Sequence, residues 1–336
     1  MTVRLGIMGC GRIVEEAHAP ALQALGDRAL VVALADPSAE RRRVVVDVLG
    51  QSDVAEFDNW QSMLDAGQLD AVVIALPHHL HARAIVDAAT AGVDVISEKP
   101  LATTLTEIDE IDDAVTSAGI QLAVMHNWMF NPEPVRAIEV IGAGLIGEPF
   151  LVRNESLNGV RWVSRDPAGD WRHDRSKSGG GLVIDSIYHP IYVSEAELMS
   201  PIVRAYASLG GEQGDETRAL ILLEHANGGS TSIQRCSTAV GGGVGVHEVH
   251  GSKGSVRFRQ ADPLILNLIF AGKPPPQPTA AGPPAPALEI FEADTGEWRP
   301  LETQPGPWWG GIREVFARTL DAWAAGQPPP ADIRAA

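Results

Sequence analysis

Cysteine is nearly absent from this sequence, which has only Cys10 and Cys236 among its 336 residues. Two cysteines cannot build the disulfide framework that small secreted domains use. A disulfide at Cys10 would also obstruct the glycine-rich turn around it. The N-terminus contains no apolar signal-peptide core, because glycines at positions 6, 9 and 11 interrupt it. The sequence therefore predicts a protein of a reducing compartment, and we expect a cytoplasmic location.

Positive charge and long apolar runs are also scarce. The formal net charge is -17, which argues against nucleic acid or an anionic membrane as a partner, since both favour a basic surface. No run approaches the roughly eighteen apolar residues that a transmembrane helix needs. The hydrophobic share of 45% is ordinary for a globular protein, and the chain is long enough for two domains with their own cores.

The first third of the sequence alternates apolar runs with helical patterns. Strands separated by crossover helices indicate a parallel, doubly wound α/β sheet, which we assign to a first domain at residues 1–126. Such sheets bind ligands at the carboxyl ends of their strands. The expected strands are 3–8, 29–35, 71–76, 93–97 and 120–125, and the expected helices are 39–49, 81–91 and 105–118.

The pattern changes after residue 126, where strand-like runs follow one another with few helices between them. This predicts a second α+β domain at residues 127–336 with a large, mostly antiparallel open sheet. A Pro-, Ala- and Gly-rich stretch at 273–287 is expected to be an exposed loop. The expected strands are 150–155, 203–209, 219–224, 230–235, 244–250, 255–259 and 264–270, and the expected helices are 135–141 and 308–324.

The N-terminal apolar run ends in the glycine turn Gly9-Cys10-Gly11, and a helical pattern follows. Strand, glycine turn and helix in this order predict a dinucleotide-binding unit, because a pyrophosphate can approach Gly11 closely and meet the helix N-terminus. Asp36 ends the second strand, where a carboxylate can bind both ribose hydroxyls and repel a 2′-phosphate. This favours NAD over NADP, although Arg41 and Arg42 lie nearby in sequence. The alternative role for Asp36 is an Asp-Pro turn.

Lys99 is informative because the sequence uses only four lysines. It ends a buried strand between Glu98 and Pro100, and the proline favours an extended or cis geometry there. Its ammonium group could hydrogen-bond a substrate oxygen and exchange a proton. The alternative is a strand-end lysine paired with Glu98.

Three consecutive glycines, 179–181, precede Asp185 and His189. The glycines allow a backbone to pass close to a ligand. Asp185 and His189 are four residues apart, so a helix would place them on one face, where the acid would fix the histidine tautomer for proton transfer. Pro190 predicts that His189 sits at a helix start. The alternative role for Asp185 is an N-cap, which is compatible with catalysis.

His78, His79 and His81 cluster after Pro77, which raises the question of a zinc site. Adjacent histidines rarely bind one ion, and no cysteine or acid stands at ligand spacing beside them. We therefore predict no metal site. We expect His81 to open a helix beside a cofactor phosphate.

Together these motifs resemble the glucose–fructose oxidoreductase, inositol dehydrogenase and rhizopine-catabolism family. The resemblance covers nearly the whole chain and implies a Rossmann domain followed by an open antiparallel sheet. It also implies a homodimer or homotetramer formed through that sheet. The matching residues are Gly9 to Ile13 with His18 and Pro20, Asp36-Pro37, Pro77 with His81, Glu98-Lys99-Pro100-Leu101, Trp171-Arg172, and Gly179-Gly180-Gly181 with Asp185 and His189.

The resemblance also implies roles for individual residues. Lys99 and His189 would form the proton-transfer pair, and Asp185 would orient the substrate hydroxyl. The substrate-binding set comprises Lys99, Trp128, Trp171, Arg172, Asp185, Tyr188 and His189. The cofactor-binding set comprises Gly9, Cys10, Gly11, Arg12, Ile13, Asp36, Arg41, Leu76, Pro77, His78, His81, Glu98, Lys99 and Asn127.

This sequence departs from the family pattern at several positions. Val14 replaces a small residue, His78 stands where Asn is frequent, and Ile187 stands where Gly is frequent. Residues 127–132 lack the arginines often seen there. Many relatives also continue beyond the equivalent of Pro330 with a helix that packs on the first domain, so we expect this chain to be shortened.

The sequence predicts an NAD(P)-dependent oxidoreductase that acts on a secondary alcohol, or the corresponding ketone, of a sugar, cyclitol or related polyol. One alternative is a glycoside hydrolase that uses NAD only transiently and shows no net NADH production. Another is a nucleotide-sensing regulator without catalysis, which the joint presence of Lys99, Asp185 and His189 disfavours.

Overall fold

The structure is a computed structural model that describes residues 2–157, 171–212, 215–238, 244–258, 288–304 and 306–333. The strand expected at 264–270 and the loop expected at 273–287 lie outside these residues. The chain divides into two compact units. Unit 1 comprises Met1–Phe130, Ser176–Gly179 and Gly306–Ala336, and unit 2 comprises Asn131–Arg175 and Gly180–Pro305.

Unit 1 contains a parallel six-stranded sheet with the strand order β3-β2-β1-β4-β5-β6. The parallel α/β sheet predicted from the sequence is confirmed. Strand β3 was missed because it has three residues, two of them exposed, and lacks an apolar run. The strands are β1 (Val3–Met8), β2 (Ala29–Ala35), β3 (Ala55–Phe57), β4 (Ala71–Ile74), β5 (Asp94–Ser97) and β6 (Leu122–Val124).

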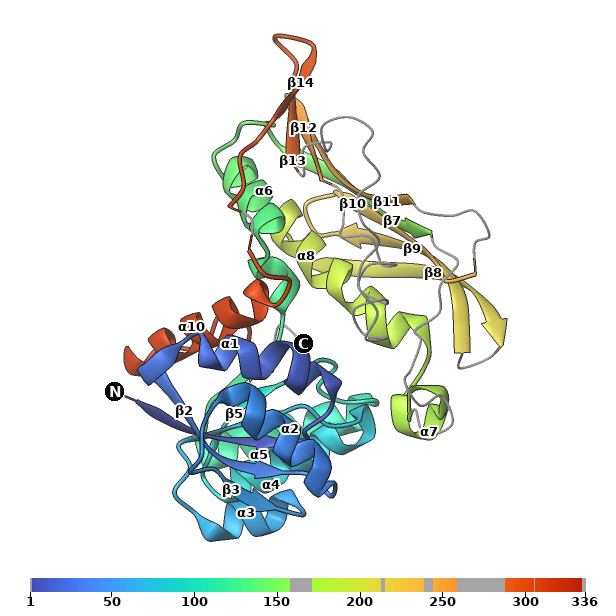
Figure 1. Cartoon of the computed structure of the whole chain (residues 1–336). Helices are drawn as coiled ribbons and strands as arrows, with labels where there is room; N and C mark the ends of the chain where they lie inside the picture. The colour runs from blue at the N-terminus through green and yellow to red at the C-terminus, as the bar shows by residue number, and fades with distance from the viewer. Residues whose placement is uncertain are drawn as a thin grey trace. The chain divides into compact units, whose positions relative to one another are not determined.

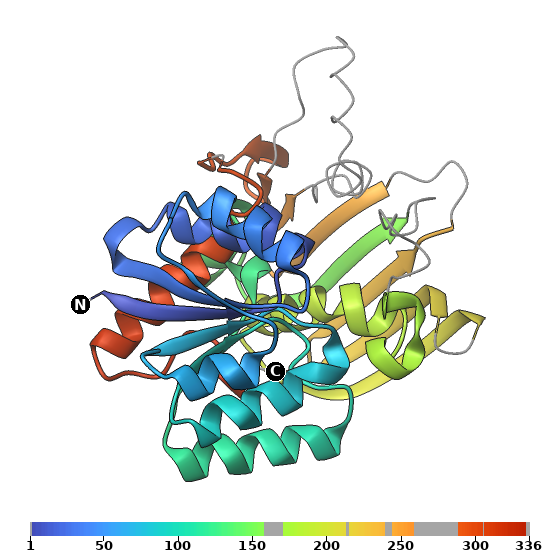
Figure 2. The ribbon, with the colours of Figure 1, turned by 60° about the horizontal axis from the view of Figure 1, so that its bottom comes forward.

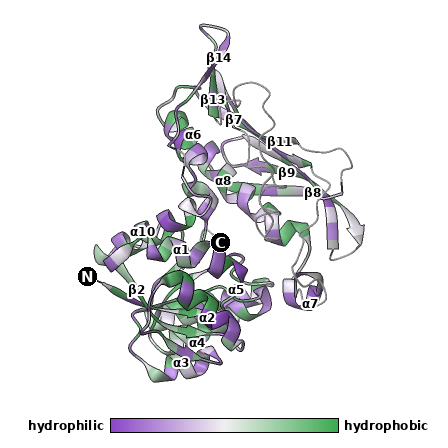
Figure 3. Ribbon diagram, in the orientation of Figure 1, coloured by the Kyte–Doolittle hydropathy of each residue, from purple (hydrophilic) through white to green (hydrophobic). Residues whose placement is uncertain are grey.

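Amphipathic helices flank this sheet, and in Figure 3 they carry both green and purple stretches. Their ends follow local sequence signals. The Thr104 side chain and Glu107 form a reciprocal capping box at the start of α5, and Gly119 ends that helix in a left-handed conformation. The helices are α1 (Ala19–Gln23), α2 (Ala39–Leu49), α3 (Trp60–Ala66), α4 (His81–Thr90) and α5 (Leu105–Ala118).

The C-terminal segment belongs to unit 1, whereas the predicted division into 1–126 and 127–336 places it in the second domain. Helix α10 (Gly310–Ala324) lies beside α1, as Figure 1 shows, and inserts the fully buried Phe316 into the core of unit 1. Further along, the carbonyl of Ala331 accepts a hydrogen bond from Val124 N–H at 2.9 Å. Helix α10 thus packs on the parallel-sheet domain, the kind of contact that the resemblance implies for a C-terminal helix in many relatives.

Two π-helical turns, Val14–His18 and Val183–Ile187, each run directly into an α-helix that contains a proline in its first turn. Proline lacks an N–H and clashes with the carbonyl four residues earlier, whereas a widened turn moves that carbonyl away. The second turn continues into α8 (Tyr188–Leu198), and helical backbone already begins at Leu182. His189 is therefore the second residue of α8, as predicted, and a π-helical turn precedes that helix.

Unit 2 contains an eight-stranded sheet with the order β14-β13-β12-β11-β7-β10-β9-β8. All neighbouring pairs are antiparallel except β7 and β10. The predicted large and mostly antiparallel sheet is confirmed. Its strands are β7 (Pro149–Leu157), β8 (Ile202–Glu212), β9 (Asp215–His225), β10 (Ser230–Cys236), β11 (Val244–Gly251), β12 (Gly254–Phe258), β13 (Leu288–Glu292) and β14 (Glu297–Pro300).

Two helices, α6 (Pro132–Gly142) and α8, cover one face of this sheet, which we call the inner face (Figure 2). Alternate residues of each strand point to this face, as strand geometry requires. Ile233 of β10, for example, is fully buried against Ile187. The opposite, outer face exposes Tyr206, Leu220 and Leu222. A short helix, α7 (Arg175–Ser178), precedes the triple glycine.

A buried polar cluster anchors α8 to the inner face. The His247 ring contacts both carboxylate oxygens of Glu197 at 2.8 Å and stacks on Phe258, and its other nitrogen contacts the Asn154 amide. His247 and Asn154 come from β11 and β7, and Glu197 comes from α8. Among the described residues, no helix is both long and apolar enough to cross a membrane.

We expect Phe316→Ala to lower the free energy of unfolding by about 3–5 kcal/mol, because it leaves a cavity among fully buried side chains of unit 1. Chemical denaturation followed by circular dichroism measures this change. Leu105→Ala, whose side chain is 84% exposed in the same unit, is the matched control and should change stability by less than about 0.5 kcal/mol. Equal effects of the two substitutions would contradict the assignment of α10 to this core.

Candidate active site

The carboxyl edge of the parallel sheet brings the predicted cofactor segments into one row. The last carbonyl of β1, β2, β4 and β5 accepts a hydrogen bond from a residue that follows a neighbouring strand. These bonds are Gly9 N–H to Ala35, Ala75 N–H to Met8, Glu98 N–H to Ile74 and Met125 N–H to Ser97, at 2.8–2.9 Å. Segments that are far apart in the sequence are therefore held side by side at the edge where such sheets bind ligands.

Gly9 and Gly11 have different structural reasons to be glycine. Gly9 has a φ of +93°, and a Cβ atom there would collide with the carbonyl oxygen of Ala75. A side chain at Gly9 would therefore disturb the sheet itself. Gly11, by contrast, has a backbone angle that any residue adopts, and a Cβ there would meet no protein atom within 4 Å. The open space above Gly11 is available to a ligand.

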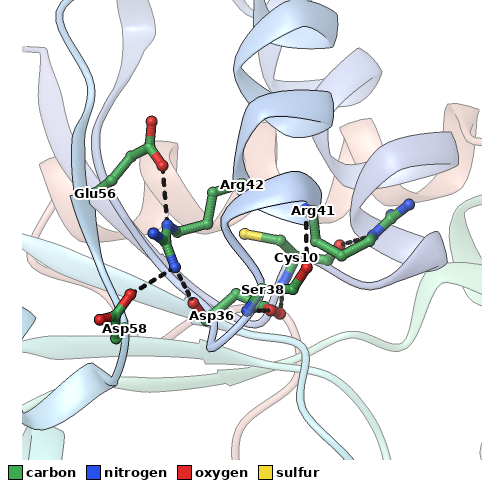
Figure 4. Close-up of polar contacts among 7 residues, drawn as sticks. All are labelled: Cys10, Asp36, Ser38, Arg41, Arg42, Glu56 and Asp58. Carbon is green, nitrogen blue, oxygen red and sulfur yellow. Dashed lines mark hydrogen bonds and ion pairs between the residues drawn. The ribbon is translucent and has the colours of Figure 1, made fainter.

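Asp36 lies beside the glycine turn and is held by two backbone groups. One carboxylate oxygen accepts a hydrogen bond from Cys10 N–H and the other from Ser38 N–H, both at 2.8 Å (Figure 4). Asp36 thus caps the Asp-Pro turn through Ser38 N–H, the alternative role considered above. The bond from Cys10 N–H also fixes its carboxylate next to the glycine turn. Each oxygen retains acceptor capacity for a further donor such as a ribose hydroxyl.

The two arginines that follow Asp36 in sequence are both paired with carboxylates. Arg41 donates to the carbonyl of Cys10 and to Glu15, both at 2.8 Å. Arg42, whose side chain is 9% exposed, bonds Glu56 and Asp58 at 2.9 Å (Figure 4). These pairs neutralise much of the positive charge that a 2′-phosphate would need.

The segment after Gly11 is helical from Arg12, and Ile13 and Val14 follow in it. The first N–H groups of a helix have no partner within the helix, and its dipole favours an anion there. Val14 is fully buried, so its larger side chain is accommodated in the core of unit 1. Burial and the charge of Asp36 raise the pKa of Cys10 to about 12, so its thiol stays protonated and unreactive.

The histidines after Pro77 contact backbone carbonyls. His78, 4% exposed, contacts the carbonyl of Ser178 at 2.8 Å. His81 is fully buried, and its two ring nitrogens lie 2.7 Å from the carbonyls of Leu76 and Pro100. Burial lowers the pKa of His81, although the two carbonyls oppose this. His81 thus joins the segment after β4 to the segment after β5. Its predicted place beside a cofactor phosphate stays a prediction.

Glu98 is positioned by His18, a contact that the sequence did not reveal. The His18 ring lies 2.8 Å from the Glu98 carboxylate and is fully buried, with its edge against Phe316. Burial disfavours ionised Glu98, but His18, Lys99 and His81 together outweigh this and lower the pKa of Glu98. Glu98 also accepts a hydrogen bond from Lys99 N–H at 3.2 Å.

Lys99 follows β5 at the carboxyl edge, partly buried, and its bond to Pro100 is cis. The next segment along the edge contains His126, which is 1% exposed and whose pKa burial lowers to about 4, so it is neutral near pH 7. Asn127 and Trp128 follow in a short 3₁₀ helix and are partly buried.

In unit 2, the predicted catalytic residues lie on the second π-helical turn and the start of α8. Asp185 lies inside this turn and is partly buried. Four residues earlier, the N–H of Gly181 donates a hydrogen bond to the Glu216 carboxylate at 2.9 Å. His189 is 8% exposed, and its Nδ1 lies 2.7 Å from the Tyr192 hydroxyl.

Tyr192 is a site residue that the sequence analysis missed. It is 6% exposed and lies three residues after His189 on the same helix, a spacing that could have revealed it. Its hydroxyl can accept a hydrogen bond from His189 Nδ1–H, which orients the ring. This contact fixes the imidazole through a neutral partner, and the predicted role of Asp185 stays a prediction.

The remaining predicted substrate residues also lie in unit 2. The Arg172 guanidinium lies over the Trp171 ring, 4.4 Å from its centroid, in a short 3₁₀ helix. The Tyr188 ring packs edge-on against Tyr192, and burial raises the Tyr188 pKa, so its hydroxyl stays protonated. In the part of the chain that the structure describes, no three His, Cys, Asp or Glu side chains gather as metal ligands.

Known protein families and proteins are similar to this chain over most of its length. Residues 3–126 match the model of an oxidoreductase family with an NAD-binding Rossmann fold, and residues 135–257 match the GFO/IDH/MocA C-terminal domain. The chain is similar to an inositol 2-dehydrogenase of Rhizobium meliloti, with 29% identity over 80% of this chain and 79% of the relative. It is also similar to a D-xylose 1-dehydrogenase (NADP(+)) of Haloferax volcanii, with 30% identity over 68% of each chain.

The fold is shared with a solved structure as well. An aldose–aldose oxidoreductase from Caulobacter crescentus, complexed with glycerol, superposes with a TM-score of 0.80 at 19% identity, over 100% of this chain and 93% of that one.

We expect Gly11→Val to weaken NADH binding by about a hundredfold or more, because the new side chain occupies the space through which the pyrophosphate would approach the backbone. The protein should stay folded, because a Cβ atom at this position meets no protein atom within 4 Å. Isothermal titration calorimetry measures the affinity, and the melting temperature should stay within about 2 °C. Gly142→Val, at another position with no atom within 4 Å, is the matched control and should leave NADH binding unchanged. Undiminished NADH affinity in Gly11→Val would contradict the proposed cofactor position.

Proposed function

Since the chain belongs to the GFO/IDH/MocA family of NAD-binding oxidoreductases, we propose that it interconverts a secondary alcohol and a ketone of a sugar, cyclitol or related polyol, using NAD. The observation that carries this proposal is the carboxyl edge of unit 1. One row of hydrogen bonds there joins the segments that carry Gly11, Asp36 and Lys99. The space above Gly11 is open, and the Asp36 carboxylate is anchored beside it.

Within unit 1, the glycine turn and the helix start at Arg12 would hold the pyrophosphate, and Asp36 the adenosine ribose. Leu76, Pro77, His78, Glu98 and Asn127 follow along the same edge toward the nicotinamide end. The cofactor supplies hydride acceptance and donation. The protein supplies orientation and proton transfer.

We assign proton transfer at the substrate hydroxyl to Lys99 and His189, with Asp185 orienting that hydroxyl. Lys99 offers an ammonium group that donates hydrogen bonds and exchanges a proton. His189 offers an Nε2 atom whose ring is oriented by the Tyr192 hydroxyl at 2.7 Å. Trp128, Trp171, Arg172 and Tyr188 would contact the substrate around them.

The outer face of the unit 2 sheet supports a homo-oligomer, either a dimer or a tetramer. Tyr206, Leu220 and Leu222 lie on neighbouring strands of this face and are 64%, 40% and 47% exposed. Exposed apolar side chains gathered on one surface are typical of an interface. Both cysteines are free thiols, in keeping with the cytoplasmic location that we propose.

We expect this protein to bind NADH about tenfold or more tightly than NADPH, because Asp36 and a 2′-phosphate would place like charges near each other while Arg41 and Arg42 are already paired. Calorimetric titration with the two cofactors measures the ratio, and Asp36→Ser should reduce it. Tighter binding of NADPH by the parent protein would show that Arg41 outweighs Asp36.

We expect Lys99→Met and His189→Ala each to lower kcat by about a hundredfold or more, the range typical of proton-transfer groups, with a much smaller effect on NADH affinity. NADH absorbance with a panel of sugars and cyclitols identifies the substrate and measures turnover. The double variant should lose less than the two separate effects multiplied together, because both residues serve one proton.

Lys253→Met, an exposed lysine in the turn between β11 and β12, is the matched control and should keep the parent rate. If Lys99→Met also keeps the parent rate, Lys99 is a strand-end lysine and the mechanism is wrong. Conversion of a glycoside without net NADH formation would instead support transient oxidation.

A further inference from the structure

Within the described residues, Arg235 is a buried cation without a counter-charge. It lies in β10, is 6% exposed, and makes one hydrogen bond to another described residue, from Nη1 to the carbonyl of Gln234 at 3.3 Å. Its Nη2 atom is buried and has no hydrogen-bond partner in the same part of the chain. No carboxylate of the described residues forms an ion pair with it, and burial lowers the pKa of Arg235 to about 10. A buried arginine without a carboxylate is costly, so its retention calls for an anion from elsewhere.

The position of Arg235 places it beside the turn that carries Asp185. Arg235 is two residues beyond Ile233 on the inner face, and it pairs in register with Ala219 of β9 and Ser156 of β7. Ile233 and Ala219 both belong to the apolar cluster that contains Ile187 of the π-helical turn. The Arg235 side chain therefore shares one sheet face with the turn that holds Asp185.

Glu216 fixes the same end of this face. The C-terminal end of β10 lies opposite the N-terminal part of β9, where Cys236 pairs with Arg218. Glu216 precedes Arg218 on β9, and its carboxylate accepts a hydrogen bond from Gly181 N–H at 2.9 Å. The glycine run before Asp185 is thus tied to the end of the sheet at which Arg235 lies.

We propose that Arg235 binds the carboxylate of an acidic sugar or polyol, so that the substrate of this enzyme is a sugar acid. The proposal rests on the oxidoreductase function proposed above. A guanidinium group presents parallel N–H donors that match the two oxygens of a carboxylate, and Nη2 is the donor that still needs an acceptor.

The charges around Arg235 favour a carboxylate over a phosphate monoester. One guanidinium group balances one negative charge, whereas a phosphate monoester carries nearly two at neutral pH. Glu216, which binds Gly181 N–H at the same end of the sheet, adds a negative charge that disfavours a doubly charged ligand more than a singly charged one. Ser156, which is 5% exposed and opposite Arg235, adds a hydroxyl group suited to a neutral or singly charged ligand.

The test compares turnover of aldonic and uronic acids, such as D-gluconate and D-glucuronate, with D-glucose, myo-inositol and D-glucose 6-phosphate. We expect kcat/KM to be highest for an acid and to fall about a hundredfold for that acid in Arg235→Met. Arg235→Lys should recover part of the loss, and guanidinium ion added to Arg235→Met should recover part as well. Arg204→Met, on exposed β8 and paired with Glu224, is the matched control and should keep the parent kcat/KM.

Thermal unfolding without substrate separates a ligand-binding role from a structural one. Met fills similar space without a buried charge. The melting temperature of Arg235→Met should therefore equal that of the parent or exceed it by about 2–4 °C. A lower melting temperature together with equal losses for acidic and neutral substrates would make Arg235 structural and overturn the proposal.

The remaining outcomes distinguish this proposal from the one on which it rests. Turnover of acids that is unaffected in Arg235→Met, or turnover of neutral polyols alone by the parent protein, overturns the carboxylate assignment and leaves the oxidoreductase function standing. Preference for the phosphorylated sugar overturns it likewise. NADH binding without turnover of any of these compounds overturns both.

Discussion

The close approach of Gly9 to the carbonyl of Ala75 is the constraint on which the candidate cofactor site depends. Only a residue without a Cβ atom lets the chain leave β1 at a φ of +93° between the ends of β2 and β4. This turn directs Cys10 N–H to Asp36 and leaves open space over Gly11. The end of β1, the Asp36 carboxylate and the helix start are therefore positioned by one steric requirement.

The two π-helical turns solve the same problem in the two units. Each places a histidine close before a proline, His18 before Pro20 and His189 before Pro190, within continuous helical backbone. The widened turn accommodates the missing N–H of the proline. In unit 1 the result is a buried ring that positions Glu98, and in unit 2 it is a ring oriented by Tyr192. An irregularity of the helix thus serves polar chemistry in both cases.

Buried charge is compensated at several places in this protein, which makes the exception informative. Arg42 contacts two carboxylates, Glu98 contacts His18, and Glu197 contacts His247. These pairs join separate segments and follow the rule that a buried charge needs a partner. Arg235 departs from this rule within the described residues. This contrast supports the proposal that a ligand completes Arg235, because the described residues provide no counter-charge.

The sequence by itself determined the fold class and most of the edge of the parallel sheet. Apolar runs separated by amphipathic helices require parallel strands, and the ends of such strands meet at one edge, so Gly11, Asp36 and Lys99 could be grouped without coordinates. Only the tertiary structure decided that α10 belongs to unit 1, that His81 joins the segments after β4 and β5, and that His18, Tyr192 and Arg235 matter. The physical reason is that burial and pairing depend on residues distant in sequence. Phe316 contacts His18, and Ser178 contacts His78. Arg235 shares a sheet face with Ile233, which packs in one cluster with Ile187 of the π-helical turn.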